Sequence, residues 1–300
     1  MDLIEKSSQD KKYNDSQNAD IWFSALRGQA FLIAGKKEAA LKALKYSEAL
    51  LQPNEPPEVL QLIYANGYIY SNQEEKALGI VNKIRENPTS SLFLEATALW
   101  INICDLSFNE LEKQLSHTEK NYSKIAEVLA RKAQDEERYD SAEKYARISI
   151  EKSKEKHLQP CYQVLADILM GKRFGVYIQI GFIKKHIDKK DWTDFDEVVK
   201  CYILSLENIE QYASSRLKSI IIYNLFLTHF IVADYYNTEK YADKLSELGL
   251  IDAGILEALL SILLRMGKVD KVISICEKRE APLLKIPRLM YIVISQIIPL

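Results

Sequence analysis

The fold is decided by the stretch Asp20–Gln52, which reads DIWFSALRGQAFLIAGKKEAALKALKYSEALLQ. On each side of Gly35, apolar residues recur every three or four positions, which is the spacing of one face of an α-helix. Glycine favours the turn after a helix, and the prolines from Pro53 onward end the second helical pattern. The stretch therefore predicts a helical hairpin, in which two helices of about 14 residues are joined by a short glycine turn.

The same hairpin pattern returns along the rest of the chain. When the hairpins are aligned on the small or apolar residue near the start of each second helix, these anchor residues are 29 to 37 residues apart. The mean spacing of about 33 residues predicts an array of similar units, in which each hairpin buries its apolar face against its neighbours. The anchor residues are Ala40, Ala77, Leu111, Ala142, Ile178, Ala213, Ala242 and Val272.

Small residues recur at a second position of the units. Gly28 precedes the anchor Ala40 by twelve residues, and Leu44 follows it by four. A small side chain lets the second helix approach the first closely, and larger side chains fill the space between successive hairpins. The equivalent pairs in the second and fourth units are Ala65 with Val81 and Ala130 with Ala146.

This arrangement resembles the tetratricopeptide repeat, a helix–turn–helix unit of about 34 residues. The resemblance covers roughly residues 20–155 and weakens beyond Pro160. It implies an all-α fold, an α-solenoid of stacked tetratricopeptide-like hairpins wound into a right-handed superhelix. On this basis we expect a polar N-terminal leader at residues 1–19, tetratricopeptide-like repeats at 20–158, and divergent helical repeats at 159–300 that pack on the first half.

The composition favours a soluble helical protein and argues against several function classes. Glycine and proline number 10 and 8 of 300 residues, fewer than a turn-rich β fold uses. A formal net charge of −2 argues against nucleic-acid binding, which needs a basic surface. The N-terminus has no secretory signal, no apolar stretch reaches the length of about 20 residues that crosses a bilayer, and the four scattered cysteines suit a reducing compartment. We therefore expect a cytoplasmic protein without a membrane contact.

No local motif for catalysis or for a bound cofactor occurs. The chain lacks a Walker A sequence, G-x-G-x-x-G, G-x-S-x-G and H-E-x-x-H. Its four histidines are at least 29 residues apart, and no cysteines have the spacing of zinc ligands. We therefore expect no catalytic residue, no metal site and no cofactor, and so no enzyme.

The resemblance implies that the first helices of the hairpins line a concave groove that holds a peptide or another protein. Residues beside the small packing residue of each first helix are candidates for this contact, because amide and guanidinium groups can donate to a peptide backbone or carboxylate. Leu289–Ile298 is apolar on all sides of the helix it would form. We expect it to be covered by another copy of the chain, by the rest of a larger protein, or by folding back on the preceding repeats. The groove candidates are Gln29 in the first unit, Asn66 and Tyr70 in the second, and Arg131, Gln134 and Asp135 in the fourth.

Three functional hypotheses stay open at this point. The first is a non-enzymatic scaffold or adaptor that binds a protein or peptide, either alone or as the repeat segment of a larger protein. The second is a regulatory protein that responds to a ligand or peptide. The third is a helical enzyme whose site is assembled from residues far apart in the sequence, which no local motif reveals.

Overall fold

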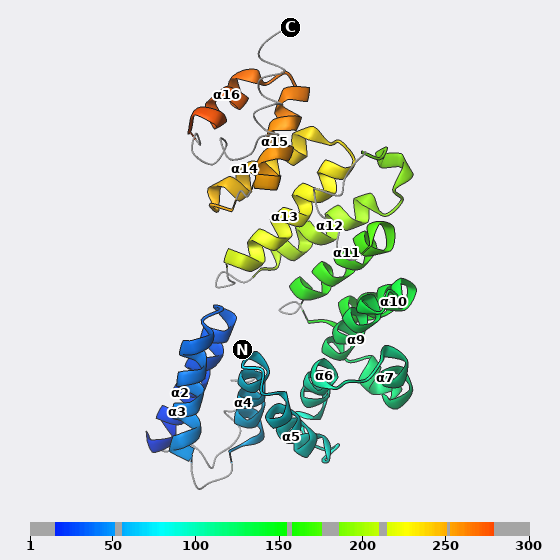
Figure 1. Ribbon diagram of the computed structural model, residues 1–300. Coiled ribbons are helices and arrows are strands. Elements are labelled where there is room, and N and C mark those ends of the chain that lie inside the picture. The colour runs from blue at the N-terminus through cyan, green and yellow to red at the C-terminus, as the bar shows by residue number, and fades with distance from the viewer. Residues whose placement is uncertain are drawn as a thin grey trace. The chain divides into compact units, whose positions relative to one another are not determined.

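The computed structural model describes residues 16–51, 56–154, 158–175, 186–209, 215–250 and 253–278. Over these residues the chain forms fifteen α-helices and one short 3-10 helix, with no β-strand (Figure 1). The expected all-α fold is therefore confirmed for this part of the chain. Most of the expected leader and the whole of Leu289–Ile298 lie outside the described residues. The chain divides into two compact units, and the described residues change from the first unit to the second after Cys161.

In the first unit, helices that follow one another in the sequence pack together. Three hairpins are formed, by α2 with α3, by α4 with α5, and by α9 with α10. The third predicted unit departs from this pattern, because its short second part, α7 and α8, packs against α9. The helices are α2 (Ser16–Ile33), α3 (Lys37–Leu51), α4 (Glu58–Tyr70), α5 (Glu74–Arg85), α6 (Phe93–Ile103), α7 (Phe108–Gln114), α8 (His117–Lys120), α9 (Ser123–Asp135) and α10 (Tyr139–Lys152).

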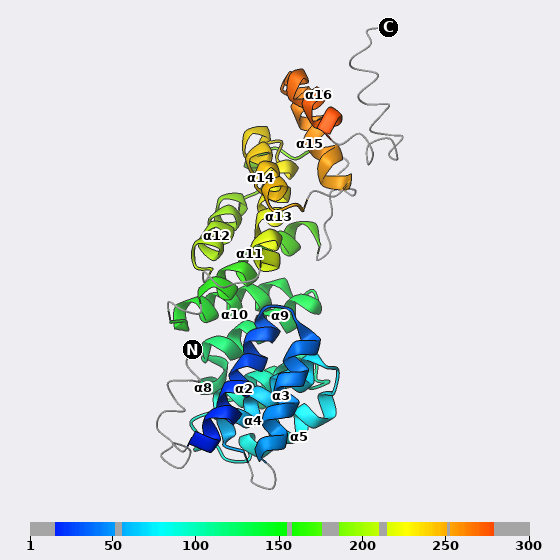
Figure 2. The same ribbon diagram turned by 90° about the vertical axis from the view of Figure 1, so that its left-hand side faces the viewer.

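The second unit is also built from consecutive helices in contact. Within it α12 packs against α13, α13 against α14, α14 against α15, and α15 against α16, and Figure 2 shows the same order from a second side. None of the described helices combines the length and the apolar character needed to span a membrane. The elements are α11 (Leu158–Phe174), whose first turn belongs to the first unit, the 3-10 helix η4 (Lys189–Asp191), α12 (Phe195–Glu207), α13 (Ser215–Ile231), α14 (Tyr235–Glu247), α15 (Ala253–Arg265) and α16 (Val269–Lys278).

One turn geometry joins the two helices of five hairpins. In each turn a residue with positive φ follows the first helix, and the next residue donates its backbone N–H to the carbonyl oxygen five residues earlier, at 2.8 to 3.0 Å. This pattern is the Schellman motif that ends many helices. The five positive-φ residues are Gly35, Asn72, Glu137, Ala233 and Gly267.

The first buried residue of the second helix lies five positions after each of these turns. The predicted anchors Ala40, Ala77, Ala142 and Val272 occupy this position, and each is fully buried. In the remaining hairpin Thr238 occupies it, so the predicted anchor Ala242 is one helical turn too late. Thr238 is polar and so does not match the small apolar pattern of the anchors. Its hydroxyl donates to the Asp234 carbonyl oxygen one turn earlier, which allows this side chain to be buried.

The other three predicted anchors have different outcomes. Leu111 is fully buried on α7, but this helix begins at a Ser107 capping box rather than at a positive-φ turn. Ile178 and Ala213 lie outside the described residues. The repeat of about 33 residues is therefore visible in five turns, and α7 shows a different way to start a helix at the same interval.

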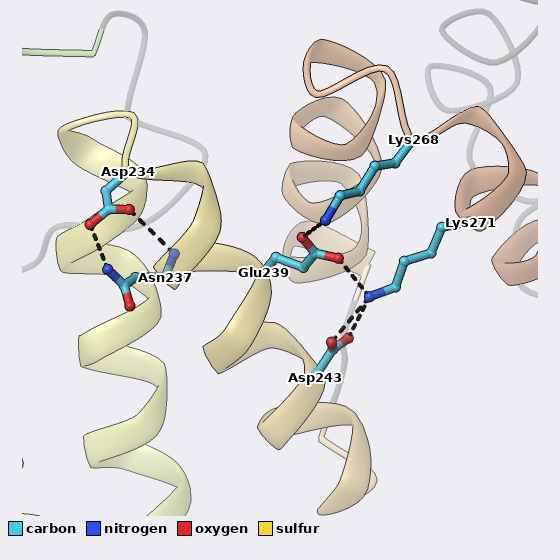
Figure 3. Close-up of polar contacts among 6 residues, drawn as sticks. All are labelled: Asp234, Asn237, Glu239, Asp243, Lys268 and Lys271. Atoms are coloured by element: carbon cyan, nitrogen blue, oxygen red, sulfur yellow. Dashed lines mark hydrogen bonds and ion pairs between the residues drawn. The ribbon is translucent and has the colours of Figure 1, made fainter.

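Polar side chains join neighbouring helices inside each unit. Ser47 on α3 donates to the carbonyl oxygen of Ile21 at 2.7 Å and accepts from the Tyr64 hydroxyl on α4 at 2.8 Å. In the second unit the buried Glu239 on α14 pairs with Lys268, between α15 and α16, and with Lys271 on α16 (Figure 3). These bonds satisfy polar groups that the packing removes from water, so they fix the positions of successive helices.

Candidate functional site

The predicted groove residues all lie on first helices of hairpins in the first unit. Gln29 is on α2, and Asn66 and Tyr70 are on α4, which packs against α2. The other three, Arg131, Gln134 and Asp135, are on α9, which packs against α6. Since α6 in turn packs against α4, the structure connects the two groups through a helix from which sequence analysis selected no residue.

Their surroundings differ. The Gln29 side-chain oxygen is buried without a hydrogen-bond partner, and Asn66 is half-buried and forms no hydrogen bond to another described residue. Tyr70 is 49% exposed at the end of α4. Arg131 pairs with Glu127 on its own helix at 3.1 Å. Asn66 and Tyr70 therefore offer an amide and an aromatic ring to a partner. The Arg131 guanidinium is already paired with Glu127, so a partner would have to compete with that carboxylate or bind beside it.

Gln134 and Asp135 complete the α9 group. Gln134 is half-buried and Asp135 is exposed, and both lie in the last turn of the helix. The residue Glu137, two positions after Asp135, has the positive φ of the hairpin turn. The acidic residues Asp135, Glu136 and Glu137 therefore form one of the recurring hairpin turns.

A contact that sequence analysis did not foresee lies between α5 and α6. The guanidinium carbon of Arg85, the last residue of α5, is 3.7 Å from the ring centroid of Trp100 on α6. The Arg85 Nε–H donates to the hydroxyl of the buried Thr97 at 3.3 Å, and Thr97 donates to the Phe93 carbonyl at 2.9 Å. The guanidinium is therefore held over the indole ring and anchored along one edge.

This guanidinium is half-buried and lacks a close carboxylate. Burial lowers the pKa of Arg85, and the negative charge of Glu119 offsets only part of this effect. Among the described residues no carboxylate lies within ion-pair distance of Arg85. In contrast, Arg131, Arg138 and Arg147 each pair with a glutamate at 2.8 to 3.4 Å.

A second positive charge acts on the same end of α6. Burial raises the pKa of the Cys104 thiol, and the charges of Lys132 on α9 and of Arg85 oppose that rise. Cys104 follows Trp100 by one helical turn. The end of α6 thus carries an aromatic ring with a stacked guanidinium, and it lies within the electrostatic influence of a lysine from the next hairpin.

The sequence held only an indirect signal for this site. Arg85 ends a helix just before Asn87 and Pro88, where the helix dipole favours a basic residue. Because the dipole alone accounts for a basic residue at this position, the sequence does not indicate a binding role for Arg85. Trp100 is one of three tryptophans in the chain. Because the two residues lie on different helices, only the crossing of α5 and α6 brings them together.

A histidine–aspartate pair in the second unit has a structural explanation. His229 on α13 is buried, and its Nδ1 lies 2.9 Å from Asp234 Oδ2. Burial lowers the pKa of His229, although Asp234 favours its charged form. Asp234 also caps α14 by accepting from the backbone and side-chain nitrogens of Asn237 (Figure 3). The pair therefore closes the α13–α14 turn.

Comparison with known proteins does not assign the chain to a family. No family model matches it, and no curated protein matches its sequence. In the part of the chain that the structure describes, no three His, Cys, Asp or Glu side chains are grouped so that they could hold a metal ion. The helical-repeat arrangement is thus the feature on which a functional argument can be built.

Proposed function

We propose that the chain is a non-enzymatic scaffold whose first unit binds an extended segment of another protein or a peptide along the first helices of its hairpins. The observation that carries the proposal is the succession of contacts from α2 to α4, from α4 to α6, and from α6 to α9. In repeat proteins, such a succession of first helices gives a partner one continuous surface. In this proposal the hairpins are tetratricopeptide-like and stack as an α-solenoid.

The side chains on these first helices suit peptide contact. Asn66 has an unused amide, Tyr70 presents an exposed ring, and α9 adds Arg131 and Gln134. Amides and guanidinium groups bind backbone carbonyls and carboxylates, and tyrosine and arginine are enriched among the residues that contribute most to binding at interfaces. The mixture supports recognition of a polar, extended chain segment.

Selection of peptides from a random display library against the whole chain tests the proposal. Asn66→Ala is expected to lower the affinity of the chain for the selected peptides about tenfold, which corresponds to the loss of one or two hydrogen bonds. Asn82→Ala is the matched control, because Asn82 is exposed on the second helix of the same hairpin. Its binding is expected to equal that of the unmodified chain.

A second matched pair tests the α9 group. Arg131 on the first helix and Arg147 on the second helix of one hairpin each pair with the glutamate four residues before them. Arg131→Ala is expected to weaken binding, and Arg147→Ala to leave it unchanged. If no peptide is selected, or if both members of each pair bind alike, the proposed groove is wrong.

A further inference from the structure

The Arg85–Trp100 contact is the tightest of its kind among the described residues. The seven other cations that lie over aromatic rings are 4.6 to 5.7 Å from the ring centroids, against 3.7 Å for Arg85. At this distance the guanidinium is in direct contact with the indole face. A ring that fixes the plane of a guanidinium also fixes the direction of its N–H groups.

The Nη nitrogens of this guanidinium have no polar partner among the described residues. Nε is bound to Thr97, but neither Nη nitrogen forms a hydrogen bond or ion pair with another described residue. Arg85 is half-buried, so part of the residue is exposed to solvent. The parallel N–H groups of a guanidinium match the two oxygens of a carboxylate, and a partly desolvated cation gains from such a partner.

Charged groups of both signs act on the end of α6. Arg85 and Lys132 supply positive charge near the end of α6, and Glu119 lies close enough to act on Arg85. The sum of these three charges is positive, which favours an anionic ligand such as a carboxylate.

From these contacts we infer that Arg85, held on Trp100, binds a carboxylate of the segment that occupies the first unit. The inference rests on the proposed function for its biological ligand, and it names the chemistry of one subsite. The carboxylate is either that of an aspartate or glutamate side chain or that of a peptide C-terminus. The Trp100 ring of this subsite lies on α6, which packs against both α4, the helix of Asn66, and α9, the helix of Arg131.

The subsite can be tested without a peptide by titration with acetate. The Nε–H signal of Arg85 is followed by nitrogen-15 NMR of the whole chain and is assigned by its loss in Arg85→Lys. A saturable shift is expected with acetate at constant ionic strength, and none is expected with acetamide. A shift no larger than that of the exposed Arg147 signal overturns the inference, because it shows only a non-specific salt effect.

A peptide cycle then separates this inference from the proposed function. In the selected peptides each acidic residue is replaced by its amide, and separately the C-terminus is amidated. Loss of the recognised carboxylate is expected to weaken binding to the unmodified chain about tenfold and to change binding to Arg85→Lys by less than about twofold. The lysine keeps the positive charge but lacks the paired, planar N–H donors of arginine. Thermal unfolding of the variant checks that it is folded.

The possible results are distinguishable. If peptides bind but Arg85→Lys discriminates carboxylate from amide as well as the unmodified chain does, the subsite is wrong and the scaffold stands. If acetate saturates the Arg85 signal but no peptide is selected, the scaffold is wrong and the subsite stands. If amidation of a side chain weakens binding, the ligand is an aspartate or glutamate side chain. If amidation of the C-terminus weakens binding, the ligand is the terminal carboxylate.

Discussion

Leu44 of α3 occupies the space into which a side chain on Gly28 of α2 would project. A Cβ on Gly28 would lie 2.6 Å from Leu44 Cγ and 3.3 Å from the backbone oxygen of Ala40. Gly67 of α4 faces the same leucine, and a Cβ there would also overlap it. The missing side chains at both glycines let one leucine fill the junction between the first hairpin and the next helix.

Gly28→Ala is expected to lower the free energy of unfolding by about 1–3 kcal/mol, because the new methyl group overlaps Leu44. Gly79→Ala is the control, since Gly79 lies on α5 and a methyl group added there would meet no atom within 4 Å. There the change is expected to raise the free energy by about 0.5–1 kcal/mol through helix propensity. Urea unfolding measures both, and equal effects would contradict the packing.

Ala233→Gly is expected to stabilise the second unit by about 0.5–1 kcal/mol. Ala233 has a φ of 56°, a conformation that costs an L-residue roughly 1–2 kcal/mol and costs glycine almost nothing. Gly267→Ala, at the same turn position of the last hairpin, is expected to have the opposite effect. Thermal unfolding compares the two variants, and a destabilised Ala233→Gly would show that the turn is not strained.

Tyr64→Phe is expected to cost about 0.5–1.5 kcal/mol at neutral pH, because the hydroxyl that donates to Ser47 is lost. Burial raises the pKa of Tyr64 from 10.0 to about 12. The folded chain thus keeps this phenol neutral while the unfolded chain ionises, so the contribution is present below pH 10.0 and is lost as the pH rises towards about 12.

Phenolate absorbance measures this titration directly. The difference between the unmodified chain and Tyr64→Phe is expected to show a single phenol that ionises near pH 12. Tyr46→Phe serves as the stability control, because this ring is 57% exposed and its replacement is expected to leave unfolding unchanged. A difference titration centred at the ordinary value of 10.0 would remove the argument.

Glu239→Gln is expected to destabilise the second unit by about 1–2 kcal/mol at neutral pH. Burial raises the pKa of Glu239, but the hydrogen bonds and charges of Lys268 and Lys271 outweigh this and hold it below 4.5. The two lysines are 41% and 36% exposed, so solvent screening keeps the effect small.

The pH dependence of this variant follows from the lowered pKa. A carboxylate with a depressed pKa contributes stability above the unfolded value of 4.5, and the contribution is lost as the pH falls through the folded value. The difference between Glu239→Gln and the unmodified chain should therefore shrink below pH 4.5. Urea unfolding at neutral pH and at a pH below 4.5 measures this difference. Glu247→Gln, at the exposed end of α14, is the control under both conditions.

The turns show how far local sequence predicts this fold. Gly35 and Gly267 mark hairpin turns by residue type alone. Glu137 and Ala233 adopt the same positive φ although their side chains ordinarily avoid it. There the packing of the two helices on each other fixes the turn, so the same geometry appears without its sequence signal. In the α13–α14 hairpin the first buried residue of the second helix is Thr238 rather than the predicted Ala242, because the prediction looked for a small apolar side chain.

The candidate site divides in a similar way. The positions of Gln29, Asn66 and Arg131 on first helices followed from their distance to the anchor residues, because helical spacing is local. The stack of Arg85 on Trp100 did not, since it depends on where α5 crosses α6. No pattern within either helix records that crossing.

By itself, the sequence determined that the described chain is helical, that five pairs of its helices form hairpins, and that small residues stand where most of those helices meet. Only the tertiary structure decided that Arg85 lies over Trp100 without a carboxylate, and that Glu239 is buried against two lysines. The physical reason is range. Helix hydrogen bonds and apolar periodicity act within about four residues of the chain. Burial and charge pairing are set by helix crossings, to which residues from several hairpins contribute at once.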